Sequence, residues 1–332
     1  MRPDGISATS SSSRVEIFER MESRVRSYSR SWPTVFVRAQ GAHVWDDNGR
    51  AYIDFFAGAG SLNYGHNPPS MKKLLIEYLA EDGVVQSLDA FTAARAQFLE
   101  ALREVILRPR ALDYRVQFPG PAGTTAVEAA LKLARIATGR TNVVCFTNSF
   151  HGMSLGALAA SGNRYKRAAS GAPLGNCTFL PFDGFLGPET DSASILRRML
   201  LEPGSGIDPP AAILLETVQG EGGVRVASDG FLQAVATVAK EAGALLIIDD
   251  IQVGCGRTGE FFSFESAGLR PDLVCLSKSV SGYGLPMALL LIGPSLDVWE
   301  PGAHSGTFRA SNPAIVTATE ALNYWRDDTL SR

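Results

Sequence analysis

The chain has 332 residues, of which 45% are hydrophobic and 20% are charged, a composition typical of globular enzymes. Its formal net charge of −3 at pH 7 provides no basic surface for nucleic acid. No apolar run approaches the roughly 20 residues that span a membrane as a helix. We therefore expect neither a nucleic-acid partner nor a membrane partner.

Cysteine and histidine residues are scattered, without the spacing of a metal or redox site. Two cysteines fall inside apolar runs, which favours buried structural thiols over reactive ones. The N-terminal segment "MRPDGISATSSSSR" lacks the apolar core of a signal peptide. We expect no metal and a cytoplasmic location. The residues concerned are Cys145, Cys177, Cys255 and Cys275, with His43, His66, His151 and His304.

The first hundred residues predict a small irregular region. Residues 1–13 have the composition of a disordered lead-in, and residues 14–28 show a helical pattern. Short strands follow in "TVFVRAQGAHVWDDNGRAYIDF", with a turn at Asp47-Asn48-Gly49. The Gly- and Asn-rich segment "FAGAGSLNYGHNPP" predicts a loop, and helical periodicity returns over residues 69–80 and 92–107.

From residue 114 onward, apolar strand-like runs alternate with amphipathic helices such as 123–138 and 229–242. The runs cover residues 114–118, 142–147, 177–182, 211–216, 244–249, 272–277 and 287–293. Continuously apolar strands between helices indicate a sheet that is buried on both faces. The sequence therefore predicts an α/β protein with a mostly parallel, seven-stranded sheet sandwiched by helices.

Polar residues collect behind these runs, where parallel sheets bind their ligands. The segment "PGPAGTT" precedes the helix over 123–138, and the unpaired N–H groups of a helix N-terminus suit a phosphate. The alternative is a plain glycine turn capped by Thr124 or Thr125. The segment matches neither a Walker loop nor a GxGxxG motif, so it does not favour a nucleotide.

Two carboxylates and one lysine also follow buried strands. Asp249 ends the run 244–249 and Asp250 follows it, a place where a buried carboxylate needs a partner. A protonated heterocycle nitrogen would satisfy one of them, and pyridoxal phosphate supplies such a nitrogen. Lys278 is either a solvated strand end or an amine that forms a Schiff base. Phe150 is either core or a ring stacked on a flat cofactor. One ligand, pyridoxal phosphate, accounts for all of these features together.

The chain resembles the class III aminotransferases of the pyridoxal phosphate-dependent transferase fold type I. The resemblance rests on "GTTAVEAALKLAR", "SFHG", "ETVQGEGG", "LLIIDDIQVGCGRTG", "PDLVCLSKSVSGYGLPM" and "GTFRASNP", and it covers most of residues 30–325. It implies that Lys278 is covalent anchor and proton carrier, and that Asp249 faces the pyridinium nitrogen. It further implies cofactor contacts for Gln252, Gly123, Thr124, Phe150 and His151. By the same resemblance, Thr307 reaches the phosphate in the neighbouring subunit of a homodimer, and Glu221 switches between two substrates.

Within the family, Asp250 in place of the usual Glu and the longer "TFRASNP" are most similar to diaminobutyrate–2-oxoglutarate aminotransferases, which serve ectoine or siderophore synthesis. This implies ping-pong transfer of an amino group from L-glutamate to L-aspartate 4-semialdehyde. The alternatives are a 4-aminobutyrate- or ornithine-type transaminase, an aminomutase, or an inactive cofactor-binding form. Arg309 is either a ligand of the substrate carboxylate or a surface arginine.

The resemblance also implies a domain division. Residues 1–13 form the lead-in, 14–65 an N-terminal part of a small domain, 66–310 the large cofactor-binding domain, and 311–332 the start of a C-terminal small domain that is incomplete here. We expect Glu221 to lack its family partner, and so to be solvated or to repel the substrate carboxylate. We expect the absence of the C-terminal part of the small domain to weaken activity more than it weakens cofactor binding.

Overall fold

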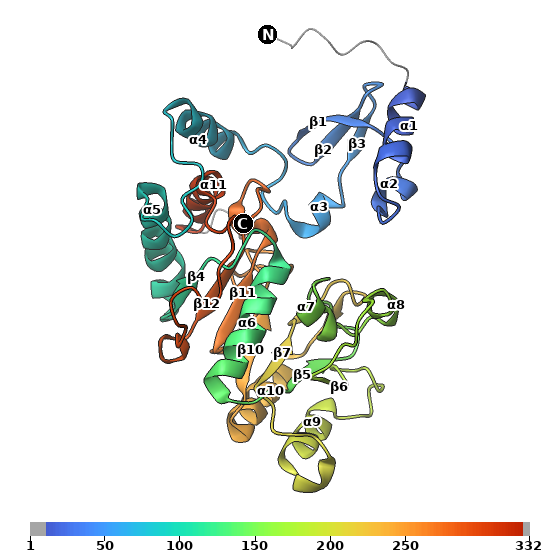
Figure 1. Cartoon of the computed structure of the whole chain (residues 1–332), viewed down its shortest axis with the longest axis vertical. Coiled ribbons are helices and arrows are strands. Elements are labelled where there is room, and N and C mark those ends of the chain that lie inside the picture. The colour runs from blue at the N-terminus through green and yellow to red at the C-terminus, as the bar shows by residue number, and fades with distance from the viewer. Residues whose placement is uncertain (1–10, 328–332) are drawn as a thin grey trace.

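The computed structural model describes residues 11–327, and its centre is one seven-stranded sheet (Figure 1). The strands lie in the order β4-β12-β11-β10-β7-β5-β6. All neighbouring pairs are parallel except those of β12, which runs antiparallel to β11 and β4. The predicted mostly parallel sheet is confirmed. Its strands are β4 (Arg115–Gln117), β5 (Val143–Phe146), β6 (Cys177–Leu180), β7 (Ala212–Leu215), β10 (Leu245–Asp249), β11 (Leu273–Leu276) and β12 (Leu289–Ile292).

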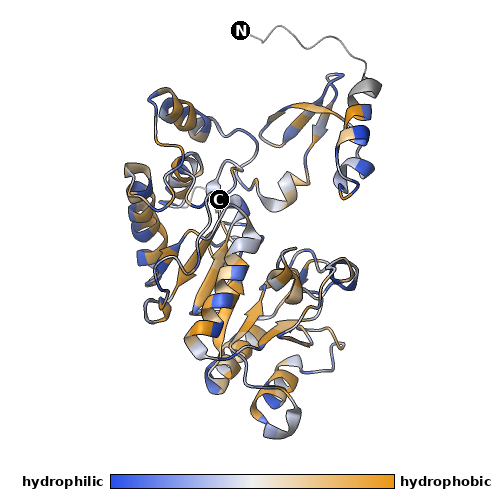
Figure 2. Ribbon diagram, viewed as in Figure 1, coloured by the Kyte–Doolittle hydropathy of each residue, from blue (hydrophilic) through white to orange (hydrophobic). Residues whose placement is uncertain are grey.

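Helices cover both faces of the sheet, because alternate strand residues are apolar on each side. Ile247 packs with α6 on one face, whereas Ile248 packs with α10 on the other. Figure 2 shows the strands as the most hydrophobic part of the fold. The first face carries α6 (Gly123–Thr138) and α7 (Leu155–Ala159); the second carries α5 (Ala93–Ala101), α9 (Ser192–Leu201), α10 (Asp229–Ala242) and α11 (Asn312–Asn323).

A second, three-stranded antiparallel sheet lies apart from the first (Figure 1). It consists of β1 (Phe36–Gln40), β2 (His43–Asp46) and β3 (Ala51–Ile53). Asp46 fixes the turn between β2 and β3, since its carboxylate accepts hydrogen bonds from Asn48 N and Arg50 N, each 2.9 Å long, and from Tyr52 Oη at 2.8 Å. The predicted turn at Asp47-Asn48-Gly49 is confirmed.

The predicted helices are confirmed with some changes at their ends. Helix α1 (Ser11–Met21) begins inside the predicted lead-in and ends before residue 28, where α2 (Tyr28–Ser31) begins; residues 1–10 lie outside the described residues. The segment 92–107 is α5 followed by a π-helical turn, Leu102–Leu107. The other elements are α3 (Ala57–Gly60), α4 (Pro69–Ala80), α8 (Arg164–Ala168), the strands β8 (Val218–Gln219) and β9 (Arg225–Val226), and short 3-10 turns at Arg108–Arg110, Pro203–Ser205, Lys278–Ser281 and Pro294–Leu296.

Burial agrees with the expected role of the cysteines. All four are free thiols, and Cys145, Cys255 and Cys275 are buried. Among residues 11–327, no helix has the length and apolar character needed to cross a membrane. The division into domains remains a prediction.

Candidate active site

Four parallel strands end at one edge of the sheet, and each ends on, or is followed by, a polar or aromatic residue that lines one pocket. Phe150 follows β5, Glu216 follows β7, Asp249 ends β10 and Lys278 follows β11. The pocket has a volume of about 160 Å³. The predicted residues that line it are Gly123, Thr124, Phe150, His151, Glu221, Asp249, Gln252 and Lys278. The sheet therefore brings together most of the side chains that the sequence had singled out.

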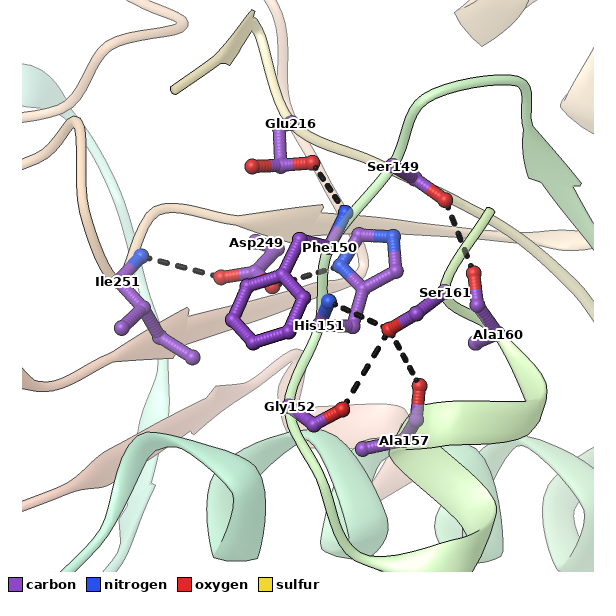
Figure 3. Close-up of polar contacts among 10 residues, drawn as sticks. All are labelled: Ser149, Phe150, His151, Gly152, Ala157, Ala160, Ser161, Glu216, Asp249 and Ile251. Atoms are coloured by element: carbon purple, nitrogen blue, oxygen red, sulfur yellow. Dashed lines mark hydrogen bonds and ion pairs between the residues drawn. The ribbon is translucent and has the colours of Figure 1, made fainter. Parts of the chain in front are cut away.

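Asp249 is the buried carboxylate at the centre of this pocket (Figure 3). Its Oδ2 lies 2.7 Å from His151 Nδ1, and its Oδ1 accepts a hydrogen bond of 3.1 Å from Ile251 N. Burial acts to lower the pKa of His151, but the hydrogen bond and charge of Asp249, together with the charge of Glu216, outweigh it and raise that pKa. His151 therefore compensates and orients the Asp249 carboxylate.

Asp250, the neighbouring carboxylate, points away from the pocket. It accepts hydrogen bonds from Ser263 N, at 3.2 Å to Oδ2, and from Ser263 Oγ. Burial raises its pKa to about 7, although the Ser263 hydrogen bonds oppose that rise. The structure thus resolves the choice that the sequence left open: Asp249, and not Asp250, faces the pocket.

Lys278 lines the pocket with a strained backbone. Its φ is 51°, in the left-handed region that side-chain-bearing residues rarely occupy. Burial lowers the pKa of its amine, while the nearby carboxylates of Asp249, Glu221 and Glu216 oppose that shift. A lowered pKa leaves more of the amine neutral and nucleophilic near pH 7. The alternative of a freely solvated strand end does not fit this position.

Glu216 is a pocket residue that the sequence analysis missed. Its Oε2 accepts a hydrogen bond of 3.0 Å from Phe150 N. Burial is the main cause that raises its pKa to about 7, and the charge of Asp249 adds to the rise. The same signal that identified Asp249, an acid at the end of an apolar run, was present in "AAILLE".

The loop that carries Phe150 and His151 is held in place by the buried hydroxyl groups of Ser149 and Ser161 (Figure 3). Ser161 Oγ accepts a hydrogen bond of 2.9 Å from His151 N and donates one of 2.9 Å to Ala157 O. Gly152 follows with φ 129°, and a Cβ there would lie 2.5 Å from Thr124 Oγ1. A glycine is therefore required where this loop crosses the start of α6.

The N-terminus of α6 forms the opposite wall of the pocket. Its N-cap residue, Ala122, makes no side-chain cap, and Thr125 N donates to Ala122 O at 2.9 Å. The N–H groups of Gly123 and Thr124 are therefore the ones placed to bind an anion. A Cβ on Gly123 would lie 3.0 Å from Ile251 Cγ2, which keeps the backbone open to a ligand. Thr124 Oγ1 lies 2.5 Å from Ser154 Oγ. The phosphate-site alternative is the better fit to this geometry.

Gln252 lies against two backbone segments. Its Nε2 donates a hydrogen bond of 3.2 Å to Ala59 O, which links the pocket to α3. A Cβ on Gly220 would lie 1.8 Å from Gln252 Oε1. Gly220, the first glycine of "TVQGEGG", is therefore needed for Gln252 to line the pocket.

Glu221 has a charged neighbour, Lys166, which is not the family partner that we expected it to lack, so that expectation stays a prediction. Lys166 Nζ lies 3.4 Å from Glu221 Oε2 and 3.7 Å from the centroid of the Phe150 ring. Nothing in the sequence around Lys166 pointed to this role, because the segment "NRYKRAAS" carries no recognisable motif.

Thr307 and Arg309 do not line this pocket. Thr307 is exposed, and its carbonyl accepts a hydrogen bond of 2.7 Å from Gln86 Nε2. Arg309 Nη2 forms an ion pair of 2.9 Å with Asp89 Oδ2. Within one chain, Arg309 therefore pairs with Asp89 and does not line the Lys278 pocket.

These residues fit pyridoxal phosphate. The uncapped helix start at Gly123 and Thr124 would hold the phosphate, and the Asp249 carboxylate retains lone pairs for a ring nitrogen. Phe150 would cover the ring, and Lys278 would bind the aldehyde carbon. Among residues 11–327, no group of three or more His, Cys, Asp or Glu side chains is arranged to hold a metal ion.

Comparisons with known proteins agree with this geometry. The family model for class III aminotransferases matches residues 25–332. The chain belongs to this family and is a pyridoxal phosphate-dependent transaminase.

Individual relatives extend the likeness. The chain is 58% identical over 314 residues to the diaminobutyrate–2-oxoglutarate transaminase of Streptomyces avermitilis, covering 94% of this chain and 74% of the relative. It is 55% identical over 318 residues to the enzyme of that name from Halalkalibacterium halodurans, covering 96% and 74%. The crystal structure of ornithine aminotransferase from Toxoplasma gondii ME49 matches with a TM-score of 0.84 at 26% identity, covering 99% of this chain and 74% of that one.

The buried Asp250 predicts a specific pH dependence. Its pKa, about 7 in the fold against 3.8 for an ordinary aspartate, means that the folded chain holds a proton which the unfolded chain releases. This contribution to stability is present below pH 3.8 and is lost as the pH rises through 7. Asp250→Asn cannot titrate, so between pH 5 and pH 8 its unfolding free energy should rise relative to that of the parent protein by about 1–4 kcal/mol, and its relative melting temperature should rise with it.

The measurement is thermal unfolding of cofactor-free protein, because ligand binding would add its own pH dependence. Glu189→Gln changes an exposed acid and is the matched control, for which the difference from the parent should not vary with pH. Parallel profiles for Asp250→Asn and the parent would contradict the assignment.

Proposed function

We propose that the chain transfers the amino group of L-glutamate to L-aspartate 4-semialdehyde, forming L-2,4-diaminobutyrate and 2-oxoglutarate. The observation that carries this proposal is the pocket itself, in which Lys278, the Asp249–His151 pair and the open start of α6 meet. The relatives named diaminobutyrate–2-oxoglutarate transaminase support the choice of substrates. The chain spans about 74% of the length of these relatives. The expected weakening of its activity remains a prediction.

Each side chain has a distinct task in this proposal. The bound cofactor supplies an electron sink for the negative charge that develops on the substrate carbon. Asp249, held by His151, would accept a hydrogen bond from the protonated ring nitrogen. Lys278 would anchor the cofactor and, as a free amine, would move a proton from the substrate carbon to the cofactor in the first half of the cycle and in the opposite direction in the second half.

The other contacts serve binding and orientation. Phe150 would cover the ring, Gln252 would contact the cofactor, and the start of α6 would hold the phosphate. We further infer that the active unit is a homodimer in which Thr307 contacts the phosphate in the partner's pocket, which its exposed position permits. We also place the enzyme in the cytoplasm, a reducing compartment in which its four free thiols remain unpaired.

Lys278→Ala tests the anchor. Borohydride reduction of the cofactor-loaded parent protein should add the mass of the reduced cofactor to the peptide that contains Lys278. The Lys278→Ala protein should show no such addition, and its transaminase rate should fall by at least about 100-fold. Mass spectrometry of the digested proteins gives the answer. Attachment to another lysine in the parent protein would overturn the assignment.

A substrate panel tests the reaction. With 2-oxoglutarate as acceptor, diaminobutyrate should give a higher kcat/KM than 4-aminobutyrate or ornithine, because the relatives at 55–58% identity are diaminobutyrate enzymes. Net conversion of glutamate to 2-oxoglutarate in the forward direction distinguishes a transaminase from an aminomutase. Good turnover of another amine without turnover of diaminobutyrate would replace the proposed substrate.

Mixed dimers test the shared pocket. Lys278→Ala and an inactive Thr307 variant should recover activity when their subunits exchange, because one pocket of each mixed dimer then collects both defects and the other collects neither. About half of randomly reassorted dimers are mixed, so recovery should reach about a quarter of the parent activity. If exchange is confirmed and no activity returns, Thr307 does not serve the partner's pocket.

A further inference from the structure

Glu128, in the first half of α6, holds a chain of hydroxyl groups that ends at the start of that helix. Its Oε1 accepts a hydrogen bond of 2.5 Å from Ser154 Oγ and one of 3.0 Å from Ala157 N. Ser154 Oγ in turn lies 2.5 Å from Thr124 Oγ1. Thr124 lines the Lys278 pocket, whereas Glu128 and Ser154 do not. A carboxylate outside the pocket is therefore connected to the pocket wall through one serine.

The same carboxylate supplies the cap that α7 lacks. Ser154 is the N-cap residue of α7 but makes no side-chain cap of its own, although a serine oxygen in that position usually accepts a hydrogen bond from the second or third N–H of the helix. Glu128 Oε1 accepts from Ala157 N instead. A Cβ on Gly156 would overlap Glu128 Oε2, so the start of α7 leaves room for the carboxylate. The Ser154 hydroxyl is thereby released for its contact with Thr124.

The chemistry of the three side chains fixes the direction of each proton. An ionised carboxylate can only accept hydrogen bonds, and a hydroxyl group has one proton to donate. Ser154 donates its proton to Glu128, so in its contact with Thr124 it must accept, and Thr124 is the donor. The Thr124 proton therefore points to Ser154. The donors left at the start of α6 are the backbone N–H groups of Gly123 and Thr124.

The first turn of α6 has few other contacts that hold it in place. Ala122 makes no side-chain cap, and the Thr125 hydroxyl donates to Ala122 O at 2.5 Å, within the same turn. Among residues 122–125 of the described structure, Thr124 is the one whose side chain is hydrogen-bonded to another element. The contact with Ser154 therefore ties this turn to the start of α7.

We propose that Glu128 is a positioning residue for the cofactor phosphate and that it acts through Ser154 and Thr124. The hydroxyl chain holds the first turn of α6 in place, so that the N–H groups of Gly123 and Thr124 meet the phosphate without having to be ordered first, which lowers the cost of binding. The Thr124 hydroxyl shapes this site and does not itself donate to the phosphate. The inference rests on the proposed position of the phosphate and holds for any amine substrate.

A double-mutant cycle tests whether Glu128 acts through Thr124. Glu128→Leu removes the acceptor at similar volume, and Thr124→Val removes the hydroxyl at similar shape. Each variant should raise the Kd of pyridoxal phosphate by about 10- to 100-fold, the loss typical of a hydrogen bond to a charged group. The double variant should bind no more than about twofold more weakly than the weaker single variant, because both changes break the same chain. Absorbance titration of the cofactor-free protein gives each Kd.

Pyridoxal separates the phosphate from the rest of the pocket, because it has the same ring and aldehyde without the phosphate. Its Kd should change by no more than about twofold in Glu128→Leu, since the variant disturbs only the phosphate contacts. Ser154→Ala breaks the chain at its middle and leaves the hydrogen bond from Ala157 N to Glu128. It should show the same selective loss of pyridoxal phosphate, even if Glu128→Leu fails to fold.

Two further variants serve as controls. Glu128→Gln keeps an oxygen that can accept from both Ser154 and Ala157, so it should hold the Kd of pyridoxal phosphate within about threefold of the parent value. Glu100→Leu makes the same kind of change at an exposed acid on α5, and it should change neither Kd. Circular dichroism melting of each variant shows whether the fold is retained.

The outcomes are distinct. If the two single losses multiply in the double variant, Thr124 serves the phosphate independently of Glu128, and the inference falls. Equal losses for pyridoxal phosphate and pyridoxal would mean that Glu128 only supports the fold. A loss in Thr124→Val without one in Glu128→Leu would keep the proposed position of the phosphate and remove the role of Glu128. If neither variant changed the Kd of pyridoxal phosphate, both the position and the inference would be wrong.

Discussion

A negative charge buried at the end of β10 is the constraint on which the pocket depends. Removing an ionised carboxylate from water is costly unless close partners replace the lost hydration. His151 and the Ile251 amide do this for Asp249. His151 can do so only because the loop after β5 lies against the end of β10, so the position of that loop depends on its contact with the neighbouring strand.

The surrounding acids show how burial divides similar side chains into different tasks. Glu216 and Asp250 both have a pKa raised to about 7 by burial, so near neutral pH they are partly protonated. Asp249 sits beside a histidine whose pKa it raises. Of the three acids, Asp249 is the one that lines the pocket with a histidine as its partner, so it is the one suited to a cofactor nitrogen. Phe150 connects the parts, since its amide binds Glu216 and its ring lies beneath Lys166.

Much of this architecture could be predicted from the sequence, because continuous apolar runs define buried strands and polar residues behind them define the ligand edge. The apolar pattern alone could not decide between Asp249 and Asp250, which only the family resemblance separated, since that choice depends on which face of β10 carries α6. Adjacent strand residues point to opposite faces, and only packing shows that Ile247 and Asp249 share the α6 face. Lys166 was out of reach for another reason: its contact with Glu221 joins segments 55 residues apart.

The left-handed backbone of Lys278 implies a trade-off between durability and chemistry. A residue with a side chain in that region costs about 1–2 kcal/mol relative to an ordinary conformation, and glycine avoids most of this cost. A chain with glycine at position 278 would thus gain resistance to unfolding while losing its amine. Selection of variants for heat tolerance alone would favour such a loss, so directed evolution of this scaffold must screen for turnover in every round.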